Sequence, residues 1–205
     1  MNINKTIKNL ENRGYNVIFI EDKNNALEVI MNHIDQDEVI AFGGSTTLSQ
    51  LGVVDYILNN DYKVLNRYQK GLSNEEIHEV ERRSLLSDIY ITGTNAIAET
   101  GELVNIDGKN NRVAAQIFGP KRVFLVTGIN KICSNLDDAI DRAKNYAAPI
   151  NAKRFEGKFT TGCMNSGVCN NCIGSTTICK TTVITRRVAE VGRTTIFLIN
   201  EDLGF

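Results

Sequence analysis

The chain has 205 residues, of which 42% are hydrophobic and 23% are charged, and its formal net charge is −1. This composition is typical of a folded globular protein, and the length suits one α/β domain. A chain without net positive charge is not expected to bind nucleic acid by neutralising phosphates. No segment reaches the roughly 18 consecutive apolar residues that span a bilayer, and the polar amino-terminal segment does not resemble a signal peptide. We therefore expect a cytoplasmic protein without a membrane partner.

Helical and strand patterns alternate along the first two thirds of the chain. Apolar residues at helical spacing predict helices, short β-branched runs predict strands, and Ser73 with Glu76 has the spacing of a helix-starting capping box. In chain order, the predicted elements are a helix from residue 3 to 13, a strand at 16–20, a helix at 24–34, a strand at 38–44 that ends in two glycines, one helix at 46–60, a strand at 62–66, a helix at 73–86, a strand-rich region at 87–107, a strand at 121–132 and a helix at 136–148.

This alternation is typical of βαβ units, which place helices on both faces of a mostly parallel sheet. The last 26 residues break the rhythm, because two β-branched runs flank "AEVG". We predict an antiparallel C-terminal hairpin there. The fold class is therefore α/β, with one domain over residues 1–205 that carries a cysteine-rich loop at 158–180.

Four of the five cysteines lie in "TGCMNSGVCNNCIGSTTIC", at residues Cys163, Cys169, Cys172 and Cys179. Thiols stay reduced in the cytoplasm, so a cluster of them indicates metal or redox chemistry rather than disulfides. Their spacers are small and polar, unlike those of cysteines in an apolar core. Four thiolates within 17 residues can surround one metal centre, while Cys133 stands apart as a solitary thiol.

The spacing C-x5-C-x2-C-x6-C leaves the metal open. A zinc ribbon usually has two C-x2-C pairs, and only one is present. The irregular spacing suits a 4Fe–4S cluster at least as well, so we favour an iron–sulfur cluster with zinc as the alternative.

Two polar loops follow predicted strands. "AFGGSTTL" places Gly43, Gly44, Ser45 and Thr46 between a buried strand and a helix, an arrangement that can bind phosphate or carboxylate or can merely cap the helix. "TGTNAIAETGEL" follows the next long strand, and ligands of open α/β sheets gather at such strand ends. We therefore expect both loops to share one cleft, with Glu99 as a candidate acid, base or nucleophile. Further candidate contacts of the second loop are Thr94, Asn95, Thr100 and Gly101.

The stretches "AFGGSTTL", "AIAETGELV", "GPKRVFLVTGINKI", "PINAKR" and "LINEDLGF" together resemble the LUD domain family of lactate-utilisation proteins. The resemblance covers nearly the whole chain and implies a Rossmann-like three-layer α/β/α domain, related to ribose-5-phosphate isomerase and CoA transferases. It implicates the loops at 43–46 and 99–101, and makes Asn151, Lys153 and Arg154 candidate anion contacts. It also implies participation in oxidising lactate to pyruvate beside iron–sulfur subunits. The cysteine quartet departs from a plain LUD subunit and looks like that of a cysteine-bearing subgroup.

Three hypotheses follow. The first is a redox accessory protein that holds an iron–sulfur cluster, works with redox partners and acts in oxidation of lactate or another small organic acid. The second is an enzyme or binder of the isomerase or CoA-transferase type, which takes a small anionic substrate and has zinc or nothing in the cysteine loop. The third is an interaction module in which the metal only fixes the loop and the chain pairs as a homodimer. The first is favoured, and whether the chain is itself catalytic is left open.

Overall fold

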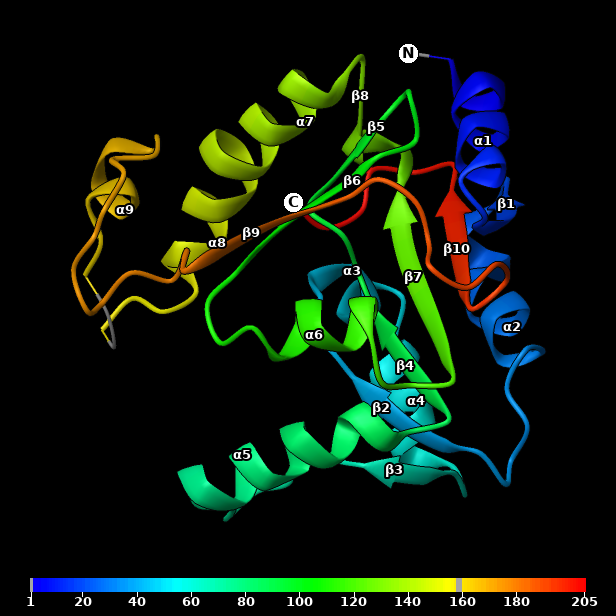
Figure 1. Cartoon of the computed structure of the whole chain (residues 1–205). Coiled ribbons are helices and arrows are strands. Elements are labelled where there is room, and N and C mark those ends of the chain that lie inside the picture. The colour runs from blue at the N-terminus through cyan, green and yellow to red at the C-terminus, as the bar shows by residue number, and fades with distance from the viewer. Residues whose placement is uncertain (1, 158–159) are drawn as a thin grey trace.

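The computed structural model describes residues 2–157 and 160–205. Its central sheet has six strands, all parallel to their neighbours, in the order β1, β10, β7, β4, β2, β3 (Figure 1). These strands are β1 (Asn16–Ile20), β2 (Val39–Phe42), β3 (Lys63–Leu65), β4 (Ile89–Thr92), β7 (Arg122–Gly128) and β10 (Thr194–Ile199). The prediction of a three-layer α/β domain with a parallel sheet is confirmed.

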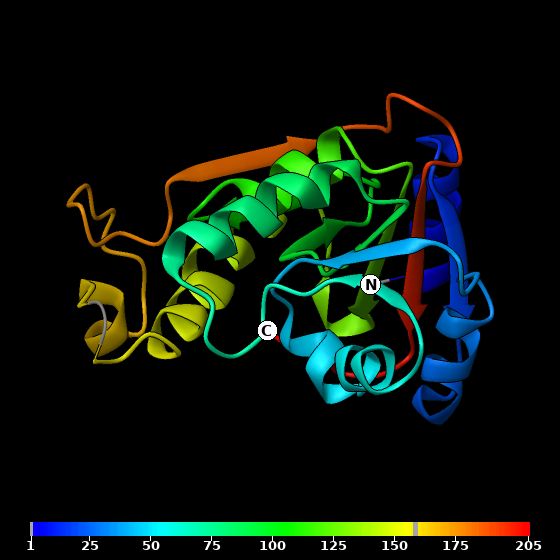
Figure 2. The same cartoon turned by 90° about the horizontal axis from the view of Figure 1, so that it is seen from below.

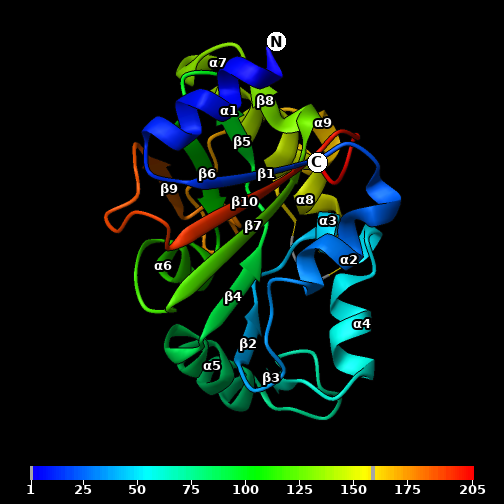
Figure 3. The same cartoon turned by 90° about the vertical axis from the view of Figure 1, so that its right-hand side faces the viewer.

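Successive side chains of these strands point to opposite faces of the sheet, and both faces are buried. One face packs against three helices, which lie together on one side of the sheet in Figure 3. These helices are α2 (Ala26–Met31), α3 (Thr46–Gln50) and α4 (Val53–Asn59). Ile40, Phe42, Ile89, Ile91 and Phe124 belong to this layer, and none of them is more than 1% exposed. A continuous apolar strand such as "IYIT" is what burial on both faces requires.

The opposite face is covered by helices and by a second, smaller sheet. The helices are α1 (Ile3–Asn12), α5 (Asn74–Arg83) with the 3-10 turn η2 (Ser84–Leu86), and α6 (Asn111–Ile117). The second sheet has the order β8, β5, β6, β9, with strands β5 (Ala96–Ala98), β6 (Leu103–Asp107), β8 (Ile132–Cys133) and β9 (Thr181–Thr185). Its far side packs against Ala139 of α7 (Leu136–Asp141) and against Ala143 of the π-helical segment that follows, η4 (Arg142–Ala147).

The predicted C-terminal hairpin is wrong. β9 pairs antiparallel with β6 in the second sheet, whereas β10 lies between β1 and β7 in the central sheet. Figure 2 shows β9 running along one edge of the molecule, well separated from β10. The burial patterns explain the difference, because every residue of β10 is buried while β9 alternates between half-buried and exposed residues. A fully buried run is typical of an inner parallel strand, and an alternating run of a strand with one solvated face.

Two other predictions are refined by the backbone. The helix predicted at 46–60 is two helices, because Gly52 has a φ of +67° and ends α3 before α4 begins. The capping box is confirmed, since Ser73 accepts from the Glu76 amide and Glu76 accepts from the Ser73 amide. The helix predicted at 136–148 continues through a π-helical segment, η4 (Arg142–Ala147), into α8 (Ala148–Lys153). Among the described residues, no helix is long and apolar enough to cross a membrane.

Candidate functional site

A cavity of 710 Å³ opens at the carboxyl ends of three neighbouring strands, β7, β4 and β2. The segments that follow these strands each contribute to its lining, through Ser45 after β2, Thr94 after β4 and Lys131 after β7. Parallel strands that are adjacent in a sheet end at the same edge, so chain segments distant in sequence meet there. The cavity has the volume of a small-molecule site.

The first predicted loop forms one wall. Gly44, Ser45 and Thr46 line the cavity, and Ser45 also caps α3 by accepting a hydrogen bond from the Leu48 amide at 3.4 Å. Gly43 is not among the lining residues but lies against the core, because a Cβ at this position would come within 2.8 Å of the Thr92 Cβ. The loop therefore combines the capping role with a position on the cavity wall.

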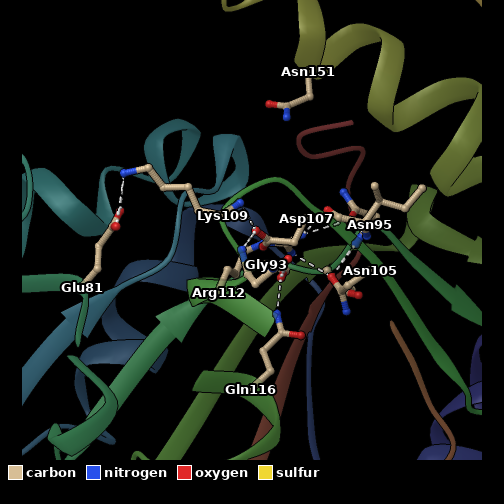
Figure 4. A network of polar contacts seen from close by, with 12 residues as sticks. Glu81, Gly93, Asn95, Asn105, Asp107, Lys109, Arg112, Gln116 and Asn151 are labelled. Atoms are coloured by element: carbon tan, nitrogen blue, oxygen red, sulfur yellow. Dashed lines mark hydrogen bonds and ion pairs between the residues drawn. The ribbon is translucent and has the colours of Figure 1, made fainter. Parts of the chain in front are cut away.

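The second wall is a polar network around Arg112, shown in Figure 4. Arg112 donates to Asp107 Oδ2 at 3.0 Å, to Asn105 Oδ1 at 2.7 Å and to Asn95 Oδ1 at 3.1 Å. It also donates to the carbonyl oxygens of Gly93 and Ile106. These bonds tie the loop after β4 to β6 and α6, so the half-buried Arg112 side chain holds Gly93 and Asn95 at the cavity wall.

The sequence did not single out Lys131, which lies in the 3-10 turn η3 (Ile129–Lys131) directly after β7. Its side chain lines the cavity, yet the residue is only 4% exposed. Its Nζ donates to Thr47 Oγ1 at 3.1 Å and to the Thr94 carbonyl oxygen at 3.2 Å. Burial, followed by the positive charges of Arg142 and Arg112, lowers the pKa of Lys131 to about 7. Within the described part of the chain, no ion pair involves Lys131.

Of the three candidates from "PINAKR", two line the cavity and one does not. Asn151 and Arg154 line the cavity, and Figure 4 shows the Asn151 side chain projecting from α8 toward the Arg112 network. The Arg154 guanidinium lies 3.5 Å from Thr46 Oγ1 and 3.3 Å from Asn151 Oδ1, which links α8 to the loop after β2. Lys153 is exposed and is not among the lining residues.

Glu99, Thr100 and Gly101 do not share this cavity, so the expectation of one cleft formed by both complete loops is wrong. Glu99 accepts hydrogen bonds from Lys5 Nζ and the Asn2 amide, both at 2.7 Å. The hydrogen bond from Lys5 lowers the pKa of Glu99. The Thr100 carbonyl accepts from Arg13, and Gly101 lies against the Arg13 side chain. These residues form the turn between β5 and β6, which packs on α1 at a different place from Lys131.

The cysteine segment lies at one end of the molecule in Figures 1 and 2. All four cysteines are free thiols on and after the short helix α9 (Gly162–Ser166). Burial, and then the nearby sulfurs of Cys163, Cys169 and Cys172, raise the pKa of Cys179 to about 11. In residues 2–157 and 160–205, however, no three His, Cys, Asp or Glu side chains are gathered as metal ligands. The predicted loop began at residue 158, and positions 158 and 159 lie outside the described residues.

The same segment reaches the cavity. Four residues that follow Cys172 in the chain line it, namely Ser175, Thr177, Ile178 and Lys180. Cys179 therefore lies between two residues of the cavity wall, Ile178 and Lys180, so a cysteine thiol is next to the candidate binding site.

A family model, described as the LUD domain, matches residues 3–199. The chain belongs to the LUD domain family. Among solved structures, a DUF162 family protein from Deinococcus radiodurans is similar over 97% of this chain and 96% of its own, with a TM-score of 0.52 and 10% identity. That similarity shows the fold. No curated protein matches the chain.

Two further solved structures match parts of this LUD domain. Ribose 5-phosphate isomerase from Plasmodium falciparum matches 54% of this chain and 52% of its own, with a TM-score of 0.35 and 16% identity. The eIF2B beta subunit from Chaetomium thermophilum matches 56% of this chain and 44% of its own, with a TM-score of 0.39 and 14% identity.

The cavity of this LUD domain is rich in cations. Arg67 and Lys109 share Glu81, and Arg112 is paired with Asp107. The other lining cations, Lys131, Arg154 and Lys180, form no ion pair among the described residues. The basic lining residues are Arg67, Lys109, Arg112, Lys131, Arg154 and Lys180, and the acidic ones are Asp55 and Asp107. An excess of positive charge in a recessed site attracts and concentrates anions.

Proposed function

We propose that this LUD domain binds a small organic anion in the cavity at the ends of β2, β4 and β7. The observation that carries the proposal is Lys131, a buried lysine on the cavity wall whose charged neighbours are both cations. A buried charge is costly unless a partner of opposite sign compensates it. An anionic ligand would supply that partner for the protonated form of Lys131, and it would also meet Arg154, which is exposed and forms no ion pair among the described residues.

The polar groups of the cavity lining support the same class of ligand. The hydroxyls of Ser45 and Thr46 and the amide of Asn151 lie on the wall beside Arg154. Hydroxyl, amide and guanidinium groups are the donors that hold carboxylates and phosphates. The family resemblance points to lactate or a related small acid as the substrate, and the isomerase-like alternative points to a phosphorylated or acylated compound.

A ligand panel tests the proposal. A ligand that binds only the folded state stabilises it by about 2.7 kcal/mol at one hundred times its Kd. For a chain of this size, that corresponds to a rise in melting temperature of roughly 5–11 °C. We expect such a rise with at least one of lactate, pyruvate, a sugar phosphate, an acyl-CoA or a folate. Propane-1,2-diol, which lacks the carboxylate of lactate, is the matched control and should give no rise. An absence of any rise across the panel would contradict the proposal.

We further propose that the four cysteines hold a metal centre, with a 4Fe–4S cluster favoured and zinc as the alternative. The residue types suit such a centre, because four free thiols lie in one segment and burial and the other three sulfurs raise the pKa of Cys179, although the described residues do not gather three of them as ligands. The lining residues Ser175, Thr177 and Ile178 favour a redox role, since they place this segment beside the cavity. A bound cluster would accept or donate single electrons there. The chain would then serve, with redox partners, in oxidation of lactate or another small acid.

Purification without oxygen tests the metal proposal. Iron and sulfide in equal amounts, about four of each per chain, together with a brown colour, indicate a cluster. About one zinc per chain and no colour indicate a structural ion. Cys172→Ser should abolish the bound metal, whereas Cys133→Ser, outside the segment, should retain it. A chain that holds neither iron nor zinc would contradict the metal proposal and leave the cavity proposal unaffected.

A further inference from the structure

Lys131 differs from every other cation of the cavity. It is a primary amine, whereas Arg112 and Arg154 are guanidinium groups that stay charged in proteins. It is also buried, whereas Lys109 and Lys180 are exposed. We propose that Lys131 is the nucleophile of this cavity and forms an imine with the carbonyl group of an anionic aldehyde or ketone. This inference rests on the proposed function, because the cavity must first bind the anion.

The hydrogen bonds of Lys131 suit a neutral amine. A neutral amine has two N–H donors and one lone pair, and the structure provides one acceptor for each donor, Thr47 Oγ1 and the Thr94 carbonyl oxygen. Among the described residues no carboxylate is paired with its Nζ, so no anionic group of the protein stabilises the ammonium form with its third proton. With both hydrogens engaged, the lone pair is the part of the nitrogen left to react.

The groups around the Lys131 amine also favour its neutral form. Arg112 approaches from α6 and Arg142 from η4, and both are held by hydrogen bonds to backbone carbonyls, Arg142 to those of Asn95 and Asn130. Gly204 closes a further side, since a Cβ there would lie 3.2 Å from the Lys131 Nζ. Burial together with nearby fixed cations disfavours the ammonium form, which is how reactive lysines are activated.

The other cations of the wall leave Lys131 free for chemistry. Arg154 has no carboxylate partner in the described part of the chain and lies beside Thr46, so it can hold the anionic group of the ligand. A permanently charged guanidinium is better suited to this task than an amine that is easily neutralised. The ligand class is therefore an aldehyde or ketone that also bears a carboxylate or phosphate.

The reaction balances without an oxidant. The Lys131 nitrogen adds to the carbonyl carbon, the π bond of the carbonyl opens, and a proton moves from nitrogen to oxygen to give a carbinolamine. Loss of the hydroxyl group with a proton, as water, then gives the carbon–nitrogen double bond. The Thr47 hydroxyl, 3.1 Å from the Nζ, is placed to relay a proton in these steps.

Reductive trapping tests the inference. The full chain is incubated with pyruvate or with glyceraldehyde 3-phosphate, treated with sodium borohydride and digested, and the modified lysine is located by mass spectrometry. The two compounds distinguish a carboxylate ligand from a phosphate ligand. We expect a stable adduct on Lys131 with at least one of them and none with acetone, which has the carbonyl but no charge.

Variants separate chemistry from binding. Lys131→Arg keeps a positive charge but removes the primary amine, and Lys131→Met removes both, so each should lose the adduct. Lys180→Met, at an exposed lysine of the same wall, should retain it. An adduct spread evenly over Lys109 and Lys180 would overturn the inference. So would the absence of an adduct on Lys131 while pyruvate or glyceraldehyde 3-phosphate still raises the melting temperature, a result that would leave the proposed function standing. If neither compound binds nor reacts, and no other member of the ligand panel raises the melting temperature, both proposals fail.

Discussion

Lys131 and Thr47 are 84 residues apart in the chain, yet the Nζ of one donates a hydrogen bond to the Oγ1 of the other at 3.1 Å. The bond joins the turn after β7 to the helix after β2, across the end of β4. A parallel sheet brings these strand ends to one edge, and the contact places an amine where three loops meet. Both side chains are buried, so water does not compete for this bond.

Replacing Lys131 by Met should change how stability depends on pH. The pKa of Lys131 is about 7 in the folded chain, whereas an unperturbed lysine, as in the unfolded chain, has a pKa of 10.5. Between these two pH values the unfolded chain therefore binds more protons than the folded chain. Stability of the wild-type chain therefore rises with pH across this window, by at most about 1.4 kcal/mol per pH unit. The variant lacks this contribution. Urea unfolding at pH 7, 8 and 9 measures this contribution as a rise, with pH, in the free energy of unfolding of the wild type relative to that of the variant. Parallel profiles for the two chains would show that Lys131 is not held neutral.

Two adjacent glycines should respond differently to alanine. A Cβ at Gly43 meets the buried Thr92 side chain and the Tyr90 hydroxyl, whereas a Cβ at Gly44 meets no atom within 4 Å. Overpacking of this kind costs about 1–3 kcal/mol, so Gly43→Ala should lower the free energy of unfolding by that amount. Gly44→Ala should change it by less than about 0.5 kcal/mol. Urea unfolding of both variants checks this pair, and equal costs would mean that Gly43 is not confined by β4.

Arg112 should contribute strongly to stability. Its side chain is only 12% exposed and is paired with Asp107, whose side chain is 7% exposed. Removing one partner of a buried pair costs about 3–5 kcal/mol, because the other charge stays buried. We expect Arg112→Met to lie near the lower figure, since Asp107 still accepts from the amides of Lys109 and Asn110.

The matched control for Arg112 is Arg82→Met. Arg82 is 71% exposed and lies 3.8 Å from Glu79, an arrangement worth less than about 1 kcal/mol. Chemical denaturation of the two variants compares a buried with an exposed arginine. If both variants lose the same stability, the network in Figure 4 does not hold the second loop in place.

Much of the fold follows from local patterns. Continuous apolar runs such as "VIAF" and "RVFLVTG" predict inner parallel strands, and Ser73 with Glu76 predicts a helix start, because burial and capping depend on neighbours in sequence. The pairing of β9 is different. Its residues alternate in burial, but which strand it joins depends on β6, which lies more than 70 residues away. Local sequence gives no such information.

The site was predicted in part for a similar reason. Ser45, Thr46, Thr94 and Asn95 follow strands that can be recognised in the sequence, and all four line the cavity. Lys131 lies at the end of the most strand-like run of the chain, and that position is the signal that was available. Its importance comes from burial and from Arg112 and Arg142, which only the tertiary structure supplies. Glu99 had the same kind of loop sequence, but α1 covers it.

Anion binding in the cavity is tested most directly by calorimetric titration of pyruvate into the wild-type chain and two variants. Arg154→Gln removes a cation from the cavity wall, and Glu99→Gln alters a carboxylate that lies outside it. We expect Arg154→Gln to weaken binding about tenfold, which is about 1.4 kcal/mol, and Glu99→Gln to bind pyruvate like the wild type. Anion binding in the cavity would be contradicted if Glu99→Gln abolished binding and Arg154→Gln left it unchanged.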